Sequence, residues 1–252
     1  MEINVKLAGV PIAISLRHDD YHYEFEQFAT DEPPLAYARL SDEMLAMLQT
    51  LYPDSPTEPR VEYNENCRPV TDALLPFGRA VFHALAFKWQ GKAWLVTAPS
   101  GTGKTTHYVQ WKRQFPDELT IMNGDKPLIE ARNDGRIWVQ PSPWYGKEAM
   151  HRDDSAELGG IILLEQSKEN KIVRQRPIAS LDRLETPRSA DDQSAVARIF
   201  AQFLFTCQNQ EQVDGVCRIE EKLLRYPLWL LSNRGDLESA RLCRETLKGA
   251  IR

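Results

Sequence analysis

The ten residues from Thr97 to Thr106 read Thr-Ala-Pro-Ser-Gly-Thr-Gly-Lys-Thr-Thr, a spacing that suits phosphate binding. An apolar run at residues 93–97 favours a strand before them, and residues 104–114 favour a helix after them. In such a loop the backbone N–H groups and the positive end of the helix dipole converge on one point. We expect Lys104 to contact the β- and γ-phosphates of ATP and the Thr105 hydroxyl to bind Mg²⁺.

The loop departs from the full phosphate-binding pattern at one position. The pattern has glycine five residues before Gly103, where this chain has Ala98. Gly101 and Gly103 can supply the backbone freedom, because glycine adopts positive φ at little cost. The alternative is a glycine-rich turn that binds no ligand. The residues predicted to hold the nucleotide are Ser100, Gly101, Thr102, Gly103, Lys104, Thr105 and Thr106.

Asp125 is the leading candidate for a second chemical group. It lies 20 residues after Thr105 and follows a short apolar run at residues 119–122 that favours a strand. In α/β sheets ligands lie at the carboxyl ends of strands. We expect this strand to pair beside the phosphate loop, so that Asp125 binds Mg²⁺ or accepts a proton from a substrate hydroxyl. The alternative is a solvated Asn-Gly-Asp turn.

Three further residues are candidates for the site. His83 lies within an apolar segment, residues 80–89, that predicts a strand before the loop, and it is either catalytic or a core histidine with both ring nitrogens bonded. Trp144 and Lys147 lie in a loop rich in aromatic and turn residues, where we expect them to bind substrate. The alternative for Lys147 is an ordinary surface lysine.

The composition bounds the class of protein. The chain has 252 residues, 42% hydrophobic and 27% charged, as in an ordinary globular protein. Its net charge of −5 argues against a general nucleic-acid or anionic-membrane binder. No apolar run approaches the roughly 20 residues that span a bilayer, and the first residues do not resemble a signal peptide, so we expect a cytoplasmic protein. Cys207 and Cys243 fall on apolar positions of predicted helices, which favours buried, reduced thiols.

The pattern along the chain predicts two parts: a small α+β accessory domain at residues 1–70 and a phosphate-loop domain at residues 71–252. In the first part we expect a hairpin at residues 3–7 and 12–16, a strand at 35–40, a helix from Ser41 to Pro53 and a linker at 54–59. In the second we expect strands at 80–89, 93–97, 119–122, 128–131, 136–140 and 159–164, the last pairing with 171–176. Helical stripes follow at residues 196–207 and 213–223, then a strand at 228–231 and a last helix from Leu237.

Three segments together resemble the catalytic domain of HPr kinase/phosphorylase. They are Phe82-His83-Ala84, residues 98–105 and Asn123-Gly124-Asp125-Lys126-Pro127. The resemblance covers roughly residues 75 to 250. It implies an α/β fold of the HPr kinase and phosphoenolpyruvate carboxykinase type, a phosphate-loop kinase core whose mixed sheet has flanking helices. It makes Lys104 and Thr105 the ATP and Mg²⁺ contacts, His83 the histidine before the loop, and Asp125 the catalytic base. The first of the family's paired aspartates is replaced by Gly124.

The resemblance implies an ATP-dependent kinase that transfers the γ-phosphate to a hydroxyl, with ATP and Mg²⁺ as its cofactors. Catalysis would involve Asp125, His83 and Lys104. The acceptor stays open among a protein serine, a peptide and a small alcohol, and oligomerisation through this domain is a further implication. Gly124 supports an alternative, a catalytically weak nucleotide-binding module with a regulatory or scaffold role. A carboxykinase-like lyase is disfavoured, because we find no residues for its second metal shell.

Overall fold

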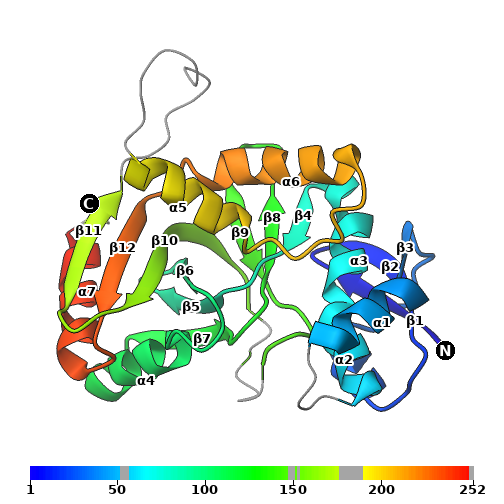
Figure 1. Cartoon of the computed structure of the whole chain (residues 1–252), viewed down its shortest axis with the longest axis horizontal. Helices are drawn as coiled ribbons and strands as arrows, with labels where there is room; N and C mark the ends of the chain where they lie inside the picture. The colour runs from blue at the N-terminus through cyan, green and yellow to red at the C-terminus, as the bar shows by residue number, and fades with distance from the viewer. Residues whose placement is uncertain (52–56, 147–150, 152–153, 176–189, 250–252) are drawn as a thin grey trace.

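The computed structural model describes residues 1–51, 57–146, 151, 154–175 and 190–249. These residues form a mixed α/β fold with a nine-stranded mixed sheet and a separate three-stranded sheet (Figure 1). The described helices are α1 (Asp42–Leu51), α2 (Glu58–Glu65), α3 (Cys67–Leu74), α4 (Lys104–Gln114), α5 (Ala190–Phe200), α6 (Gln210–Leu223) and α7 (Leu237–Lys248), with short 3₁₀ turns at His22–Phe28 and Leu75–Phe77. The strands are β1 (Glu2–Leu7), β2 (Val10–Ser15), β3 (Ala36–Arg39), β4 (Arg79–Val81), β5 (Leu85–Trp89), β6 (Lys92–Thr97), β7 (Leu119–Asn123), β8 (Leu128–Ala131), β9 (Ile137–Gln140), β10 (Ala156–Gln166), β11 (Lys171–Gln175) and β12 (Leu228–Asn233).

The large sheet brings several strand ends to one edge. Its order is β4-β8-β9-β10-β6-β5-β7, and β12 pairs with β10 and with β11. The strands β6, β10 and β12 are parallel, whereas β5 is antiparallel to both β6 and β7. The carboxyl ends of β6, β7, β10 and β12 therefore share an edge, and β5 begins there. This is the edge at which α/β sheets bind ligands.

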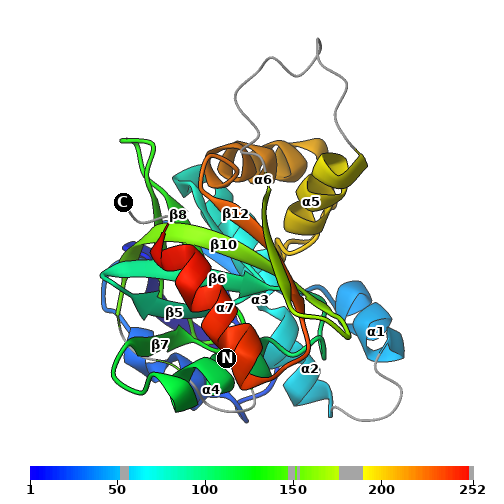
Figure 2. The same cartoon turned by 90° about the vertical axis from the view of Figure 1, so that its left-hand side faces the viewer.

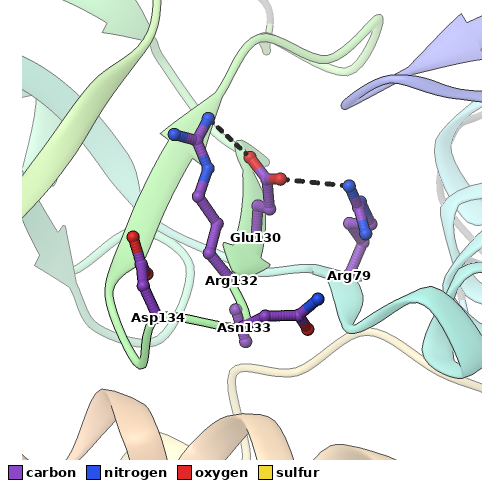
Figure 3. Close-up of a pocket in the computed structure, with 6 residues that line it drawn as sticks. Arg79, Glu130, Arg132, Asn133 and Asp134 are labelled. Carbon is purple, nitrogen blue, oxygen red and sulfur yellow. Dashed lines mark hydrogen bonds and ion pairs between the residues drawn. The ribbon is translucent and has the colours of Figure 1, made fainter.

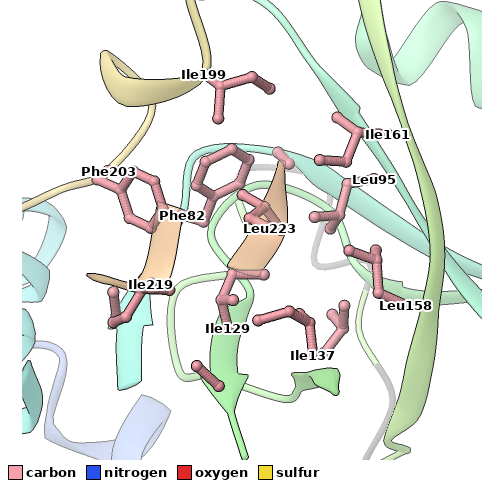
Figure 4. Close-up of a cluster of buried hydrophobic side chains, with 14 of the residues drawn as sticks. Phe82, Leu95, Ile129, Ile137, Leu158, Ile161, Ile199, Phe203, Ile219 and Leu223 are labelled. Carbon is pink, nitrogen blue, oxygen red and sulfur yellow. The ribbon is translucent and has the colours of Figure 1, made fainter. Parts of the chain in front are cut away.

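Alternating side chains bury both faces of this sheet. Leu95 and Ile161 lie in one cluster with residues of α5 and α6, part of which is drawn in Figure 4. Their neighbours Val96 and Ile162 lie in a second cluster with residues of α4 and α7. Successive side chains of a strand point to opposite faces, so a strand covered on both sides is apolar at nearly every position. Figures 1 and 2 show α5 and α6 on one side of the sheet and α4 and α7 on the other.

The N-terminal residues form the three-stranded sheet and the helices α1 to α3. β1 and β2 make an antiparallel hairpin, and β3 pairs parallel to β2. A third apolar cluster contains Val5 and Ile12 of this sheet together with Val81, Leu128 and Trp144 from beyond residue 70. The helix α3 runs through residue 70. The division into domains at residues 1–70 and 71–252 stays a prediction.

Most local predictions are confirmed. The helix α4 has the predicted bounds, and the hairpins β5–β6 and β8–β9 turn at the expected residues. The hairpin β1–β2 also forms, but β2 begins at Val10, two residues before the predicted strand. The strand β3, the helix α1 and the strand β7 also form where the sequence indicates. These elements are specified by nearby residues: Ser41 caps α1 by accepting a hydrogen bond from the Met44 N–H at 3.1 Å, and Asp134-Gly135 makes the β8–β9 turn.

Several predictions that depend on distant pairing are wrong. The strand expected at residues 80–89 is two strands, broken at residues 82–84, because this segment bonds to other parts of the chain. The predicted pairing of residues 159–164 with 171–176 does not form: β11 pairs with β12, which lies between β11 and β10. The helix expected to reach Cys207 ends at Phe200. Glu58 and Pro59, expected in the linker, belong to α2, and residues 52–56 lie outside the described residues.

The cysteine prediction is half right. Cys243 is buried in α7, but Cys207 is exposed and adopts a φ of 56° beyond the end of α5. Cys67, at the start of α3, is also buried, and burial raises the pKa of its thiol to about 12. None of the described helices has the length and the apolar character needed to cross a membrane.

Gly160 is predicted to be intolerant of any side chain. A Cβ added there would lie 2.7 Å from a ring carbon of Trp229 and 2.9 Å from the backbone oxygen of Pro227. We expect Gly160→Ala to lower the free energy of unfolding by about 1–3 kcal/mol, measured by urea denaturation. Gly249→Ala is the control, since its Cβ would meet nothing closer than 3.5 Å. Equal stabilities of the two variants would contradict this packing.

Thiol labelling checks the burial of the cysteines. The thiolate is the reactive form, so a raised pKa and burial both suppress alkylation. In mildly alkaline buffer we expect iodoacetamide to modify Cys207 in the native protein while Cys67 and Cys243 react only in denaturant. Mass spectrometry of the alkylated peptides gives the order. Labelling of Cys67 as fast as Cys207 would show that α3 is not packed as described.

Candidate active site

The loop between β6 and α4 turns at two glycines. Gly101 and Gly103 adopt φ of 76° and 105°, the region that favours glycine, and Gly103 directly precedes the first turn of α4. Thr102 closes the turn: its N–H and its hydroxyl donate to the Pro99 carbonyl at 3.3 and 2.8 Å. The side chain of Gln166, at the end of β10, donates to the Gly101 carbonyl at 3.4 Å.

The predicted nucleotide contacts all lie on this loop and the first turn of α4. Ser100 and Gly101 are exposed, and Thr105 is half-buried. A helix N-terminus with unsatisfied N–H groups attracts anions. The predicted contacts therefore lie together around a helix N-terminus, with part of the loop open to solvent. Their role in binding a nucleotide stays a prediction.

Lys104 is the exception, because its side chain turns inward. It is 8% exposed, and its amine donates to His83 Nε2 at 3.0 Å and to the Ala98 carbonyl at 3.1 Å. Burial lowers the pKa of the Lys104 ammonium, and the negative charge of Asp125 opposes that shift only in part. A buried cation needs acceptors, and these two contacts supply them. The amine is thus held beside the loop by these two protein acceptors.

His83 lies in the segment that breaks the predicted strand. On one side of this segment, Phe82 N–H donates to the Pro127 carbonyl at 3.0 Å and Ala84 N–H to the Asp125 carbonyl at 2.9 Å. These bonds connect the segment between β4 and β5 to the chain that follows β7. The break therefore places His83 next to Asp125. A continuous strand from residue 80 to 89 would not make these bonds.

The other side of the same segment is also bonded. His83 N–H donates to the Gln202 carbonyl at 2.8 Å, and Leu204 N–H donates to the Val81 carbonyl at 3.0 Å. The Thr97 hydroxyl, at the end of β6, donates to the His83 carbonyl at 2.7 Å. The backbone at His83 is therefore held by the strand of the phosphate loop and by the chain after α5.

Asp125 is positioned by a turn that Asn123 organises. The Asn123 side-chain oxygen accepts hydrogen bonds from the Asp125 N–H at 2.9 Å and the Lys126 N–H at 2.8 Å. The Asn123 amide donates to the Ser142 hydroxyl at 3.0 Å. Such a turn fixes the direction in which the next side chains leave the strand. Asn123 is fully buried, so this bonding is shielded from water.

The Asp125 carboxylate faces three cationic or titratable side chains. Its Oδ1 lies 3.5 Å from His83 Nε2, and its Oδ2 lies 4.0 Å from the Lys126 amine. Burial raises the pKa of the Asp125 carboxyl, but the contact with His83 and the positive charges of Lys126 and Lys104 outweigh it, and the net pKa is below its usual value. The carboxylate is therefore ionised at neutral pH.

The expected sheet order needs one correction. β7, which leads to Asp125, does not pair with β6; β5 lies between them. Because β5 is antiparallel to both, β6 and β7 still run in the same direction and end at the same edge. Asp125 reaches the loop from one strand further away, with His83 between them at the start of β5.

Trp144 lies beside the turn that carries Asp125, since its carbonyl accepts from the Lys126 N–H at 3.1 Å, but its side chain is committed elsewhere. Trp144 is 1% exposed, and its indole N–H donates to the Tyr63 carbonyl at 2.7 Å. It packs edge-on against Phe25 with ring centroids 5.8 Å apart, so it joins the N-terminal part to the chain after β9. Lys147 lies outside the described residues. Binding of substrate by either residue stays a prediction.

Two residues near the site were not singled out from the sequence. Gln202 contacts His83, 119 residues earlier in the chain. The Lys126 amine donates to the Asn64 carbonyl at 2.9 Å, near the carboxyl end of α2, where the helix dipole favours a cation. No local pattern signals either contact. The Asn-Gly pair at residues 123–124 is a turn signal that could have identified Asn123.

A hollow of about 400 Å³ lies elsewhere on the large sheet (Figure 3). Arg79 and Arg132 line it and pair with Glu130 at 3.0 and 3.1 Å. Asp134, also in its wall, pairs with Arg136. The hollow lies at the ends of β4 and β8 opposite to those that lead to His83 and Asp125. It is therefore separate from the candidate active site.

Asn123 offers a test of how the turn holds Asp125. In Asn123→Ala the Asp125 N–H loses its acceptor, whereas the Lys126 N–H keeps the Trp144 carbonyl, and an unsatisfied buried polar group costs about 1–3 kcal/mol. We expect a loss of about 2 kcal/mol or more in the free energy of unfolding, measured with urea. If the alanine variant were as stable as the wild type, the turn would not depend on this side chain.

Comparison with known proteins adds a distant structural similarity. No protein-family model matches the chain, and no curated protein matches it. Among solved structures, an Hpr(Ser) kinase/phosphatase from Coxiella burnetii aligns over 68% of this chain and 95% of its own. The two share 13% sequence identity with a TM-score of 0.34. The similarity is distant.

Proposed function

We propose that this chain is an ATP-dependent phosphotransferase that transfers the γ-phosphate to a hydroxyl group. One observation carries the proposal: Lys104, His83 and Asp125 meet at the N-terminus of α4, with 3.0 Å between the Lys104 amine and His83 Nε2 and 3.5 Å between that nitrogen and Asp125. A phosphate cradle, a cation and a carboxylate at one edge of the sheet are the parts that phosphoryl transfer requires.

The loop residues Ser100 to Thr106 would bind the phosphates. The positive φ of Gly101 and Gly103 lets backbone N–H groups turn toward the ligand, and the dipole of α4 favours negative charge there. Lys104 would exchange its present acceptors, His83 Nε2 and the Ala98 carbonyl, for phosphate oxygens. Since a phosphate is a stronger acceptor than either, this exchange favours binding.

The residues present fit a magnesium ion that arrives with ATP. Among the described residues no three His, Cys, Asp or Glu side chains enclose a metal site. Mg²⁺ at such sites is held by one or two protein oxygens, phosphates and water. Thr105 and Asp125 would supply the protein oxygens. Bound there, the ion would neutralise charge on the phosphates.

Asp125 would orient the acceptor and take its proton. The hydroxyl oxygen attacks the γ-phosphorus, the bond from that phosphorus to the β–γ bridging oxygen breaks, and ADP leaves with that electron pair. The proton of the hydroxyl passes to Asp125. Its lowered pKa makes it a weak base but keeps it ionised. The proton can therefore move late, once the new P–O bond has made the hydroxyl more acidic.

A second candidate function is a nucleotide-binding module with little turnover. The observation that favours it is Gly124, which is buried beside Asp125 and offers no carboxylate to a metal. Under this alternative the loop binds ATP and the module acts in regulation or as a scaffold.

The phosphate acceptor would be a molecule that presents a hydroxyl group to Asp125. A serine of a protein or peptide and a small alcohol all carry the hydroxyl that Asp125 would deprotonate. We also propose that Trp144 and Lys147 bind substrate, that His83 takes part in catalysis and that the protein assembles into a homo-oligomer.

Two substitutions separate binding from transfer. Asp125→Asn keeps the size of the side chain but removes the base, so we expect transfer to fall about 10²- to 10⁴-fold while the Kd for ATP changes little. Lys104→Met removes the cation, and we expect the Kd to rise about 10- to 100-fold. Calorimetry measures ATP binding, and radiolabelled γ-phosphate follows transfer to serine peptides, glycerol and water.

Each outcome discriminates. Equal transfer rates for the wild type and Asp125→Asn would show that Asp125 is not the base. Tight ATP binding by the wild type with no transfer to any probe would favour the nucleotide-binding module. No ATP binding at all would overturn both functions.

A further inference from the structure

Gln202 braces His83 through both its backbone and its side chain. It follows the end of α5, is 8% exposed, and its carbonyl accepts the His83 N–H at 2.8 Å. Its side-chain oxygen lies 3.1 Å from His83 Nδ1. A buried glutamine usually has hydrogen-bond partners for its amide, because an unpaired polar group in the interior is costly.

The orientation of the Gln202 amide follows from its other partner. Its Nε2 donates to the Arg198 carbonyl at 3.1 Å. A flipped amide would place its oxygen against that carbonyl oxygen, where two acceptors repel each other. The hydrogen-bond network therefore assigns Oε1 to the side that faces His83.

This orientation determines which nitrogen of His83 carries the proton. Gln202 Oε1 can only accept, so Nδ1 must be the donor. In a neutral imidazole Nε2 then has a lone pair. That lone pair faces the Lys104 amine at 3.0 Å, which can only donate. Three successive hydrogen bonds therefore link Lys104 to His83, His83 to Gln202 and Gln202 to the Arg198 carbonyl, and each has one donor and one acceptor.

Asp125 is the weaker neighbour of the same nitrogen. Its Oδ1 lies 3.5 Å from Nε2, half an ångström further than the Lys104 amine. His83 can donate to Asp125 only when Nε2 carries a proton. In the neutral ring fixed by Gln202, Nε2 instead accepts from Lys104, and Asp125 keeps its contact with the Lys126 amine at 4.0 Å.

We propose that Gln202 is a positioning residue that holds His83 in its Nδ1-protonated tautomer, so that Nε2 accepts from Lys104 and orients the amine toward the phosphate loop. The catalytic meaning of this role rests on the proposed function, but the tautomer itself does not. Without the Gln202 acceptor, the ring proton can move to Nε2. There it would face the Lys104 ammonium unfavourably, and the N–H would donate to Asp125 instead.

Nitrogen NMR of the histidine rings tests the proposal directly. The protein is labelled with ¹⁵N-histidine and held at about pH 8.5, where an ordinary imidazole, with a pKa of about 6.5, is neutral. We expect a pyrrole-type Nδ1 and a pyridine-type Nε2 for His83, assigned by comparison with His83→Asn. Gln202→Met, similar in shape but without an acceptor, should shift His83 toward the Nε2-protonated form. Gln202→Glu keeps an oxygen for Nδ1 and should retain the wild-type pattern.

ATP binding gives a second readout. We expect the Kd for Mg-ATP to rise about tenfold in Gln202→Met and to be restored in part in Gln202→Glu. An Nε2-protonated His83 in the wild type, or a wild-type ring spectrum in folded Gln202→Met, would overturn the proposal. If Gln202→Met does not fold, the wild-type spectrum alone still decides the tautomer. An Nδ1-protonated ring in a protein that binds no ATP would instead contradict the proposed function and leave the positioning role standing.

Discussion

The buried ammonium of Lys104 is the constraint on which the site depends. Removing a charge from water costs several kcal/mol unless acceptors replace the water. Here the acceptors come from two distant places, the Ala98 carbonyl at the start of the loop and His83 Nε2 before β5, and the charge of Asp125 adds to them. Three strands must end or begin at one edge of the sheet to bring these groups together.

The break in the strand at His83 is the structural cost of that arrangement. Its backbone bonds to the chain after β7 on one side and to the chain after α5 on the other, so all three N–H groups of residues 82–84 and the His83 carbonyl are paired. In a continuous strand, the backbone of His83 would be paired with neighbouring strands of the sheet. The break instead lets one short segment contact Asp125, Lys104 and the chain after α5.

The sequence was sufficient where the determinants are local. Loop glycines, an Asp-Gly turn and a capping serine act within a few residues, and α4, the β8–β9 hairpin and α1 follow from them. The partner of β11 and the contact from Gln202 to His83 depend on which distant segments pack together. Hydrophobic periodicity identifies a buried face but not its partner, and so this part of the site had no signal in one sequence.

Gly124 changes the balance between phosphate and metal at this edge. Lys104 and Lys126 carry two positive charges near one carboxylate, that of Asp125. A second carboxylate at position 124 would cancel the remaining positive charge and give Mg²⁺ another ligand. With glycine there, the local field favours the polyphosphate over a free cation. Under the proposed function, the nucleotide would therefore bring its metal into the site, and ATP binding would be the step that assembles the proposed active arrangement.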